Sequence, residues 1–454
     1  MKSKLYRMET YGIKNIENSK VINFQPYTFN KNKLKKDVSK IKAIYGTNGA
    51  GKTAIVQSVY FYKAILEDSD YLRQKGVIRN LKNLLNKKVE EFYISMIFES
   101  FQDDMSNLIY KHELNIYYDD VDDQIYIKKE KLSTLKDKTI NGEYITVFEV
   151  NNGELCFFGN KKDDFIELLY NKSQNMLRSS SLISLFSKKE ILESILNLVD
   201  KNEKNQIMPN KTIRTLLDTR LFAKDLFVYL NKEDNNAKNS KIVINEYINI
   251  LLKNKRMIED IIEHRISSDD DFILRDELED YRLKVNRLAK FIKVFKPELE
   301  KIELEIKEDG DFLHCRKIMN YSNYLVDTAY ESTGIRKLMR IYNSIEYAAK
   351  GKIVFIDELD ANISSVYLNK LLEYLQIEGE GQLCFTTHNL LPMNYLYQLS
   401  QSIDFIGETG KIISWKKNGN YKPYNLYPEG MIEDSPFNVE YYDFIEVFTN
   451  EGDE

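Results

Sequence analysis

The sequence predicts an α/β protein in which a phosphate-binding sheet, an antiparallel β layer and a helical segment follow one another. A glycine-rich loop lies between a short apolar run at 41–46 and a helical pattern that starts at 52. Aromatic and β-branched runs between 90 and 150, parted by acidic or Asn-Gly turns, predict the antiparallel layer. Apolar residues at spacings of three and four predict five or six helices between 161 and 310.

These patterns divide the 454 residues into three parts. Residues 1–160 form one lobe of a head with the glycine-rich loop and the β layer, 161–310 form a helical insertion, and 311–454 form the second lobe. No heptad pattern continues for three repeats, and Pro297 ends the longest helical candidate, so no long coiled-coil arm is expected.

Composition excludes several classes of protein. The net charge of -5 and the pI near 5.8 argue against a nucleic-acid binder with a basic surface overall, although a local basic stripe is compatible with them. The three cysteines lie far apart without a C-x-x-C motif, which favours a reducing compartment. Without an apolar signal segment or a long apolar run, the sequence predicts a cytoplasmic protein with no membrane partner.

The loop "GTNGAGKT" at 46–53 fits the P-loop pattern G-x-x-x-x-G-K-[ST]. Glycines allow successive backbone N–H groups to surround a phosphate at the start of a helix. Lys52 is expected to lie between the β- and γ-phosphates of ATP, and the Thr53 hydroxyl is expected to bind Mg²⁺. A chance glycine-rich turn is the alternative, but the preceding strand and the Lys-Thr pair favour the P-loop. The residues expected to bind the nucleotide here are Gly46, Asn48, Gly49, Gly51, Lys52 and Thr53.

The run "IVFIDELD" predicts a strand at 353–356 that ends in two acids. Ligands of open α/β sheets bind at the carboxyl ends of strands. Asp357 is therefore the candidate magnesium ligand, and Glu358 is the candidate group that polarises the attacking water. A strand ending in acids is common by chance, so this interpretation depends on the P-loop about 300 residues earlier, which requires a large insertion between them.

Two weaker features follow the same logic. His388 in "LCFTTHN" comes directly after another buried strand, where an imidazole could reach the γ-phosphate, although a lone histidine is more often structural. Ser332 and Gly334 in "YESTGIRKLM" open an amphipathic helix and form a candidate anion site. Taken alone, an ordinary helix cap at Ser332 is the simpler interpretation.

Together and in this order, the motifs "GTNGAGKT", "ESTGIRKL", "IVFIDE", "LDANIS" and "TTHN" resemble the ABC-type ATPase heads of the SMC, Rad50 and RecF class. Within that class the chain is most similar to the compact prokaryotic AAA15 and OLD-like ATPases. The resemblance covers roughly 1–150 and 310–454 and implies an ABC-type P-loop ATPase head with an antiparallel β layer and a mostly helical insertion.

The resemblance also implies that two heads dimerise around ATP and Mg²⁺. Lys52, Thr53, Asp357, Glu358 and His388 of one copy would face Ser332 and Gly334 of the other, with Asp360 crossing the interface. Gln102 would be the further residue that senses Mg²⁺. Lys337 stands where an arginine is usual, which removes a bidentate donor from the signature helix.

By resemblance, an ATPase of this size acts as the sensor of a bacterial abortive-infection or PARIS-type anti-phage system. It would respond to a phage trigger and control a separate TOPRIM- or RloB-like effector nuclease. No D-x-D motif follows His388, and His264 and His314 are interpreted more simply as structural, so no nuclease domain is recognised in this chain. Turnover is expected to be slow.

Two alternative functions remain open, and the aromatic stretch near the end has two interpretations. A RecF-like clamp would bind DNA through a basic, salt-sensitive surface. A scaffold would bind ATP with little turnover. The aromatic stretch at 421–448 would either pack over the head or dock a partner protein.

Overall fold

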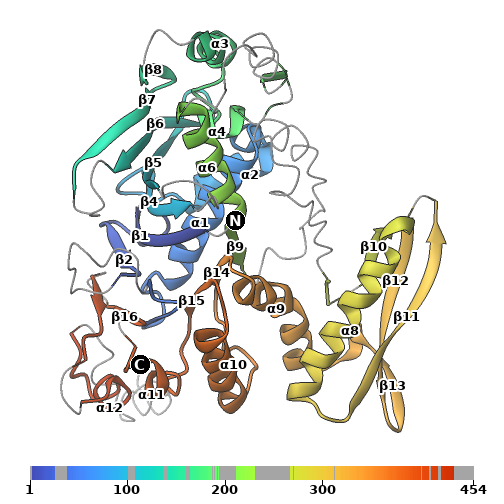
Figure 1. Cartoon of the computed structure of the whole chain (residues 1–454). Coiled ribbons are helices and arrows are strands. Elements are labelled where there is room, and N and C mark those ends of the chain that lie inside the picture. Colours follow the sequence, from blue (N-terminus) through green and yellow to red (C-terminus); the bar gives the residue numbers. More distant parts are fainter. Residues whose placement is uncertain are drawn as a thin grey trace, which may run out of the picture.

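Figure 1 shows the computed structural model of the chain. The structure describes residues 3–25, 38–100, 108–135, 142–159, 164–186, 188, 190, 191, 193, 211–230, 266–268, 270–310, 312–399, 401–407, 411–417 and 421–433. Gln102, His264 and the end of the chain from 434 lie outside the described residues, so the predictions that concern them stay predictions.

A six-stranded sheet carries the P-loop, with strand order β17-β16-β3-β15-β14-β9. Its strands are β3 (Ile41–Gly46), β9 (Leu226–Tyr229), β14 (Ile353–Ile356), β15 (Gln382–Thr386), β16 (Ile403–Ile406) and β17 (Ile412–Ser414). All neighbouring pairs are parallel except β16 with β17. β3, β14, β15 and β16 are buried along their whole length, as expected for strands covered on both faces. The predicted strands at 41–46 and 353–356 are confirmed.

Helices cover both faces of this sheet. They are α1 (Lys52–Glu67), α9 (Thr333–Ala349), α10 (Ser365–Ile377), and the short α11 (Met393–Leu396) and α12 (Pro423–Leu426). The side chains of β3 alternate between two hydrophobic clusters, as strand geometry requires. Ile44 belongs to the cluster that contains the apolar side chains of α1, whereas Ala43 and Tyr45 belong to the cluster of α9 and α10. The P-loop therefore leaves the sheet between two separate cores.

A seven-stranded antiparallel sheet forms the predicted β layer, with strand order β2-β1-β4-β5-β6-β7-β8. Its strands are β1 (Ser3–Tyr11), β2 (Lys20–Asn23), β4 (Glu91–Ser100), β5 (Leu108–Asp119), β6 (Gln124–Leu135), β7 (Tyr144–Asn151) and β8 (Glu154–Phe158). One hydrophobic cluster joins this sheet to α1, so it packs against the helix that follows the P-loop. Two further elements follow α1: η1 (Tyr71–Arg73) and α2 (Lys75–Leu84). The mixed α/β fold class with an antiparallel layer is confirmed.

The stretch 161–310 is only partly helical in the described residues. Its helices are α3 (Asp164–Ser173), α4 (Leu182–Leu185), α6 (Lys211–Asp225) and α8 (Leu278–Phe295), with η3 (Arg275–Glu277) before α8. β9 lies within this stretch, which the sequence predicts to be mostly helical, and it pairs in parallel with β14 inside the P-loop sheet. Four consecutive apolar or aromatic residues can belong to a buried strand or a buried helix, and periodicity alone does not separate the two.

A third sheet precedes α9, which begins within the motif "ESTGIRKL" at 331–338, called the signature motif from here on. It contains β10 (Asp271–Leu274), β11 (Leu299–Asp309), β12 (Phe312–Tyr321) and β13 (Tyr324–Asp327), and η4 (Thr328–Tyr330) follows it. The sheet is antiparallel, with β12 between β10 and β11 and with β13 also paired to β12. In Figure 1 this sheet and α8, in yellow and orange, stand to one side of the head.

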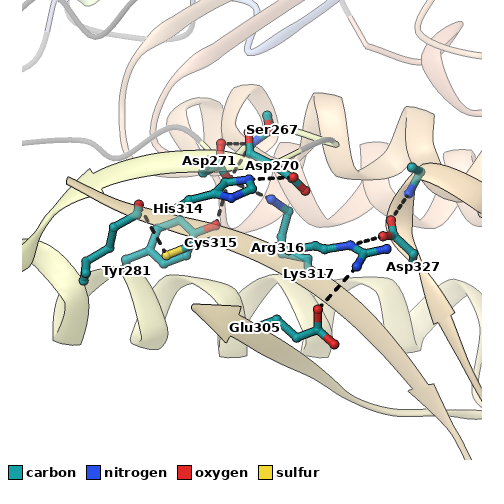
Figure 2. A network of polar contacts seen from close by, with 12 residues as sticks. Ser267, Asp270, Asp271, Tyr281, Glu305, His314, Cys315, Arg316, Lys317 and Asp327 are labelled. Atoms are coloured by element: carbon teal, nitrogen blue, oxygen red, sulfur yellow. Dashed lines mark hydrogen bonds and ion pairs between the residues drawn. The ribbon is translucent and has the colours of Figure 1, made fainter. Parts of the chain in front are cut away.

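Polar contacts hold this third sheet together, as Figure 2 shows. The Lys317 ammonium lies 2.8 Å from the Asp271 carboxylate, to which the Tyr281 hydroxyl donates a hydrogen bond of 2.7 Å. On the same sheet, His314 Nε2 lies 2.7 Å from the Asp270 carboxylate, and its ring stacks on Phe272. His314 therefore makes its contacts within the sheet, in agreement with the interpretation of this residue as structural.

Candidate nucleotide-binding site

The P-loop joins β3 to α1 and depends on glycine at two places. A side chain at Gly46 would lie 2.6 Å from the carbonyl oxygen of Ile406, so only glycine allows β3 and β16 to approach this closely. Gly51 precedes α1 with φ +104°, a conformation that other residues rarely adopt. The glycines of the motif thus build the loop before any ligand is considered.

The Lys52 side chain lies within the loop. Its Nζ donates hydrogen bonds of 2.7 and 2.9 Å to the carbonyl oxygens of Gly46 and Thr47. Burial lowers the pKa of Lys52, and the negative charges of the nearby acids at 357, 358 and 360 oppose that shift. The structure therefore brings together a lysine and the acids of a strand that lies about 300 residues later.

Both acids after β14 are fixed by hydrogen bonds. The Asp357 N–H donates to the carbonyl oxygen of Tyr229 over 3.0 Å, and Asp357 Oδ1 accepts a 2.7 Å bond from the Thr386 hydroxyl. The same Thr386 oxygen accepts the N–H of Glu358 at 2.8 Å. Asp357 is buried, whereas Glu358 is exposed and has φ +50°. Sequence reasoning predicted the two acids and missed Tyr229 and Thr386.

His388 follows β15 and lies beside the P-loop. A cavity of about 250 Å³ is lined by Tyr45, Gly46, Thr47, Asn48, Thr387, His388, Leu390 and Tyr427. The structure thus places His388 and the first half of the P-loop on one cavity. Tyr427, which follows α12, was not predicted as part of this site.

A second unpredicted contact comes from the loop after β1. The Asn15 side-chain amide donates a hydrogen bond to the carbonyl oxygen of Gly49, and a side chain built at Gly51 would lie 3.1 Å from Ile16. The connection between β1 and β2 therefore packs against one side of the P-loop. The isolated dipeptide "NI" carries no motif that would have predicted this contact.

The residues present fit a magnesium nucleotide. Among the described residues, the Thr53 hydroxyl has no hydrogen-bond partner, and Asp357 uses only Oδ1. No group of three or more His, Cys, Asp and Glu side chains able to hold a metal occurs in the part of the chain that the structure describes. Magnesium suits such a sparse set, because it is usually bound by one or two protein oxygens together with phosphates and water.

Ser332 and Gly334 are not brought to this cavity in the same chain. Ser332 caps α9, since its Oγ accepts the N–H of Ile335 at 3.3 Å, as the simpler interpretation predicted. A side chain at Gly334 would lie 2.8 Å from the carbonyl oxygen of Asn362. Asn362 lies in the loop after β14, two residues after Asp360. Ser332 itself is exposed, and neither residue is among those that line the cavity.

One comparison with known proteins covers the stretch of the chain that contains the P-loop and both acids. Residues 41–394 match the family described as "AAA domain, putative AbiEii toxin, Type IV TA system". The chain belongs to this family. The match begins in β3 and ends in α11, so it includes the P-loop, the signature motif, both acids and His388. No curated protein matches the sequence.

Three solved structures resemble the chain weakly. The SMC head domain from Thermotoga maritima is 11% identical, with a TM-score of 0.33, and covers 91% of this chain and 100% of that one. Two structures of the recombination mediator protein RecF, with ATPrS and with ATP, are 14% and 12% identical, with TM-scores of 0.37 and 0.35. Each covers 91% of this chain and 99% of the RecF chain. Because these identities and TM-scores are low, the chain is assigned to its family only by the match of residues 41–394.

No helix in the described part of the chain combines the length and the apolar character needed to cross a membrane.

Proposed function

We propose that this chain is an ATP-hydrolysing ABC-type ATPase. The observation that carries the proposal is the meeting of Lys52, the acids after β14 and His388 around one P-loop. In this proposal the Lys52 ammonium exchanges its two carbonyl acceptors for the β- and γ-phosphates of ATP. Thr53 and Asp357 would hold Mg²⁺, which would neutralise charge on the phosphates.

Glu358 and His388 are proposed to act at the γ-phosphate end. The Glu358 carboxylate is exposed next to Lys52 and would accept a proton from, or orient, the attacking water. His388 would donate a hydrogen bond toward the terminal phosphate oxygens from the wall of the cavity.

A second copy of the chain is proposed to complete the site. Ser332 is exposed at the start of α9, where the N-terminus of a 17-residue helix favours an anion, yet it does not line its own cavity. A phosphate from the partner's nucleotide would satisfy this helix end. Asp360, whose charge acts on Tyr45 in the cavity wall, would cross the same interface. Homodimers then form with ATP between the heads.

The biological role is proposed as the sensor of an anti-phage system. The matched family is named for a toxin–antitoxin system, which supports a role in abortive infection. The ATP-bound dimer would hold a separate effector nuclease inactive until a phage trigger alters the assembly. Co-purification of the product of an adjacent gene with this chain is the direct test of that pairing. Purification of the chain alone from a host with the whole locus would contradict it.

The variant Glu358→Gln tests hydrolysis itself. The amide cannot accept the proton, so turnover should fall while ATP binding persists and dimers accumulate. Glu378→Gln is the matched control, because Glu378 is an exposed acid at the end of α10. Phosphate release and size-exclusion chromatography with ATP are the measurements. Wild-type turnover in both variants would reject Glu358 as catalytic, and little turnover even in the wild type would favour the scaffold alternative.

A further inference from the structure

The geometry points to Thr386 as a positioning residue for both acids of the ATPase site, an inference that rests on the proposed function. Its single hydroxyl donates to Asp357 Oδ1 at 2.7 Å and accepts the N–H of Glu358 at 2.8 Å. This hydroxyl sets the direction in which the Asp357 carboxylate would face a metal ion, and it fixes the turn from which Glu358 projects.

The hydroxyl is isolated from water. Thr386 has no exposed surface, and Asp357 is only 5% exposed. A threonine hydroxyl has one hydrogen to donate, and here that hydrogen is donated to Asp357. One lone pair of the same oxygen accepts the N–H of Glu358. Because Thr386 and Asp357 are both buried, bulk water cannot replace the bond between them, and both acids share this one oxygen atom.

Glu358 needs such a support because its backbone is unusual. Its φ of +50° lies in the left-handed region, which residues other than glycine rarely adopt. The side-chain oxygen of Thr386 holds the Glu358 N–H, and its backbone oxygen accepts the next N–H, that of Leu359, at 3.1 Å. One residue therefore bonds two successive amides of the left-handed turn. Strained backbone of this kind persists at functional sites when its surroundings fix it.

Asp357 gains a defined orientation from the same contact. With Oδ1 engaged by Thr386 and the backbone N–H engaged by Tyr229, the carboxylate has few ways to rotate. Oδ2 has no hydrogen-bond partner among the described residues and is the oxygen left for a metal. Partners of this kind, which orient a ligand without touching the metal, change metal affinity or activity by about 10- to 100-fold when they are removed.

The position of Thr386 also connects the acids to the rest of the site. Thr386 pairs with Ile44 of β3, two residues before Gly46 of the P-loop. Two residues after Thr386, His388 lines the cavity. A shift at the end of β15 would therefore move the acids relative to the P-loop and His388 together.

The test compares Thr386→Val, which keeps the shape and removes the hydroxyl, with Thr386→Ser, which keeps the hydroxyl. Thr219→Val is the matched control, because Thr219 is equally buried and its hydroxyl donates within α6, to the carbonyl oxygen of Thr215. Thr386→Cys replaces the valine variant if valine prevents folding. The readouts are kcat, the Mg²⁺ concentration for half-maximal turnover, and the affinity for a non-hydrolysable ATP analogue with and without Mg²⁺.

Thr386→Val is expected to lower kcat by about tenfold or more and to raise the Mg²⁺ requirement severalfold. It should bind the metal-free analogue as the wild type does and lose the gain in affinity that Mg²⁺ gives. Thr386→Ser should restore both properties, and Thr219→Val should change neither.

An unchanged Mg²⁺ requirement in Thr386→Val, or a serine variant as impaired as valine, would overturn the inference. A wild-type chain that neither binds nor hydrolyses ATP would instead reject the proposed function, so the two failures are distinguishable.

Discussion

Arg220 of α6 caps the helix that follows the P-loop: its Nη2 lies 2.8 Å from the carbonyl oxygen of Glu67, the last residue of α1. Nη1 donates to the preceding carbonyl, that of Leu66. The last carbonyls of a helix have no partner within it, so the guanidinium satisfies one buried and one partly buried carbonyl oxygen that the helix leaves unpaired. α6 thereby holds the far end of α1, whose first residue is Lys52.

Arg220→Met should destabilise the fold. Arg220 is 3% exposed, and its removal leaves two helix carbonyls without donors, at a cost of about 2–3 kcal/mol in the free energy of unfolding. Arg73→Met is the control, since Arg73 pairs with an exposed Asp70 and should cost less than about 1 kcal/mol. Chemical denaturation measures both. Equal effects would show that the cap does not stabilise α1.

The buried pair of Lys42 and Asp404 should be costly to break. These residues join β3 to β16 with a distance of 2.9 Å, and neither side chain is exposed. Asp404→Ala leaves a buried ammonium unpaired and should cost about 3–5 kcal/mol. The double variant Lys42→Met/Asp404→Leu should recover most of that loss, because an apolar pair of similar volume replaces the ions. A double variant that is as unstable as Asp404→Ala in denaturation experiments would contradict the coupling.

Tyr45→Phe should leave stability unchanged or raise it. Tyr45 has no exposed surface, and its hydroxyl has no hydrogen-bond partner among the described residues. Removing a buried, unpaired polar group is expected to be neutral or to stabilise by about 1 kcal/mol. Tyr110→Phe is the contrast, because the Tyr110 hydroxyl donates a 2.5 Å bond to Asp218 and its loss should destabilise. Thermal melts that rank the two variants in reverse order would refute the assignment.

The sequence predicted the elements of the fold that have strong local signals. The strand before Gly46, the helix after it and the antiparallel runs between 90 and 150 all appear, since each has a clear period and defined turns. The short run at 226–229 falls within the stretch that the sequence predicts to be mostly helical. Its partner β14 lies more than 120 residues away, and such distant pairing leaves no local trace.

The same contrast holds at the site. Lys52, Asp357 and Glu358 belong to motifs in which residue type and spacing reflect chemistry, so they could be predicted. Thr386 and Asn15 act through one side-chain hydrogen bond each to an acid or to the loop. Those bonds depend on how strands from different parts of the chain pack, which residue type and spacing do not reveal.

Lys52→Met should abolish ATP binding without unfolding the chain. Methionine keeps the length of the side chain, but it cannot donate to the loop carbonyls or to a phosphate. Because burial disfavours the charged Lys52, the loss of this charge should cost little stability. Fluorescent ATP-analogue titration and thermal melts measure the two effects. Wild-type affinity would place the nucleotide elsewhere.

The composite site is tested most directly by mixing two inactive chains. Lys52→Met disables the P-loop of one copy, and Ser332→Arg blocks the signature end of the other. In a mixed dimer, both defects fall in one site, and the second site combines an intact P-loop with an intact signature motif. The account predicts that each variant alone is inactive and that the mixture hydrolyses ATP. Wild-type turnover by Ser332→Arg alone, or no activity in a mixture that forms mixed dimers, would contradict it.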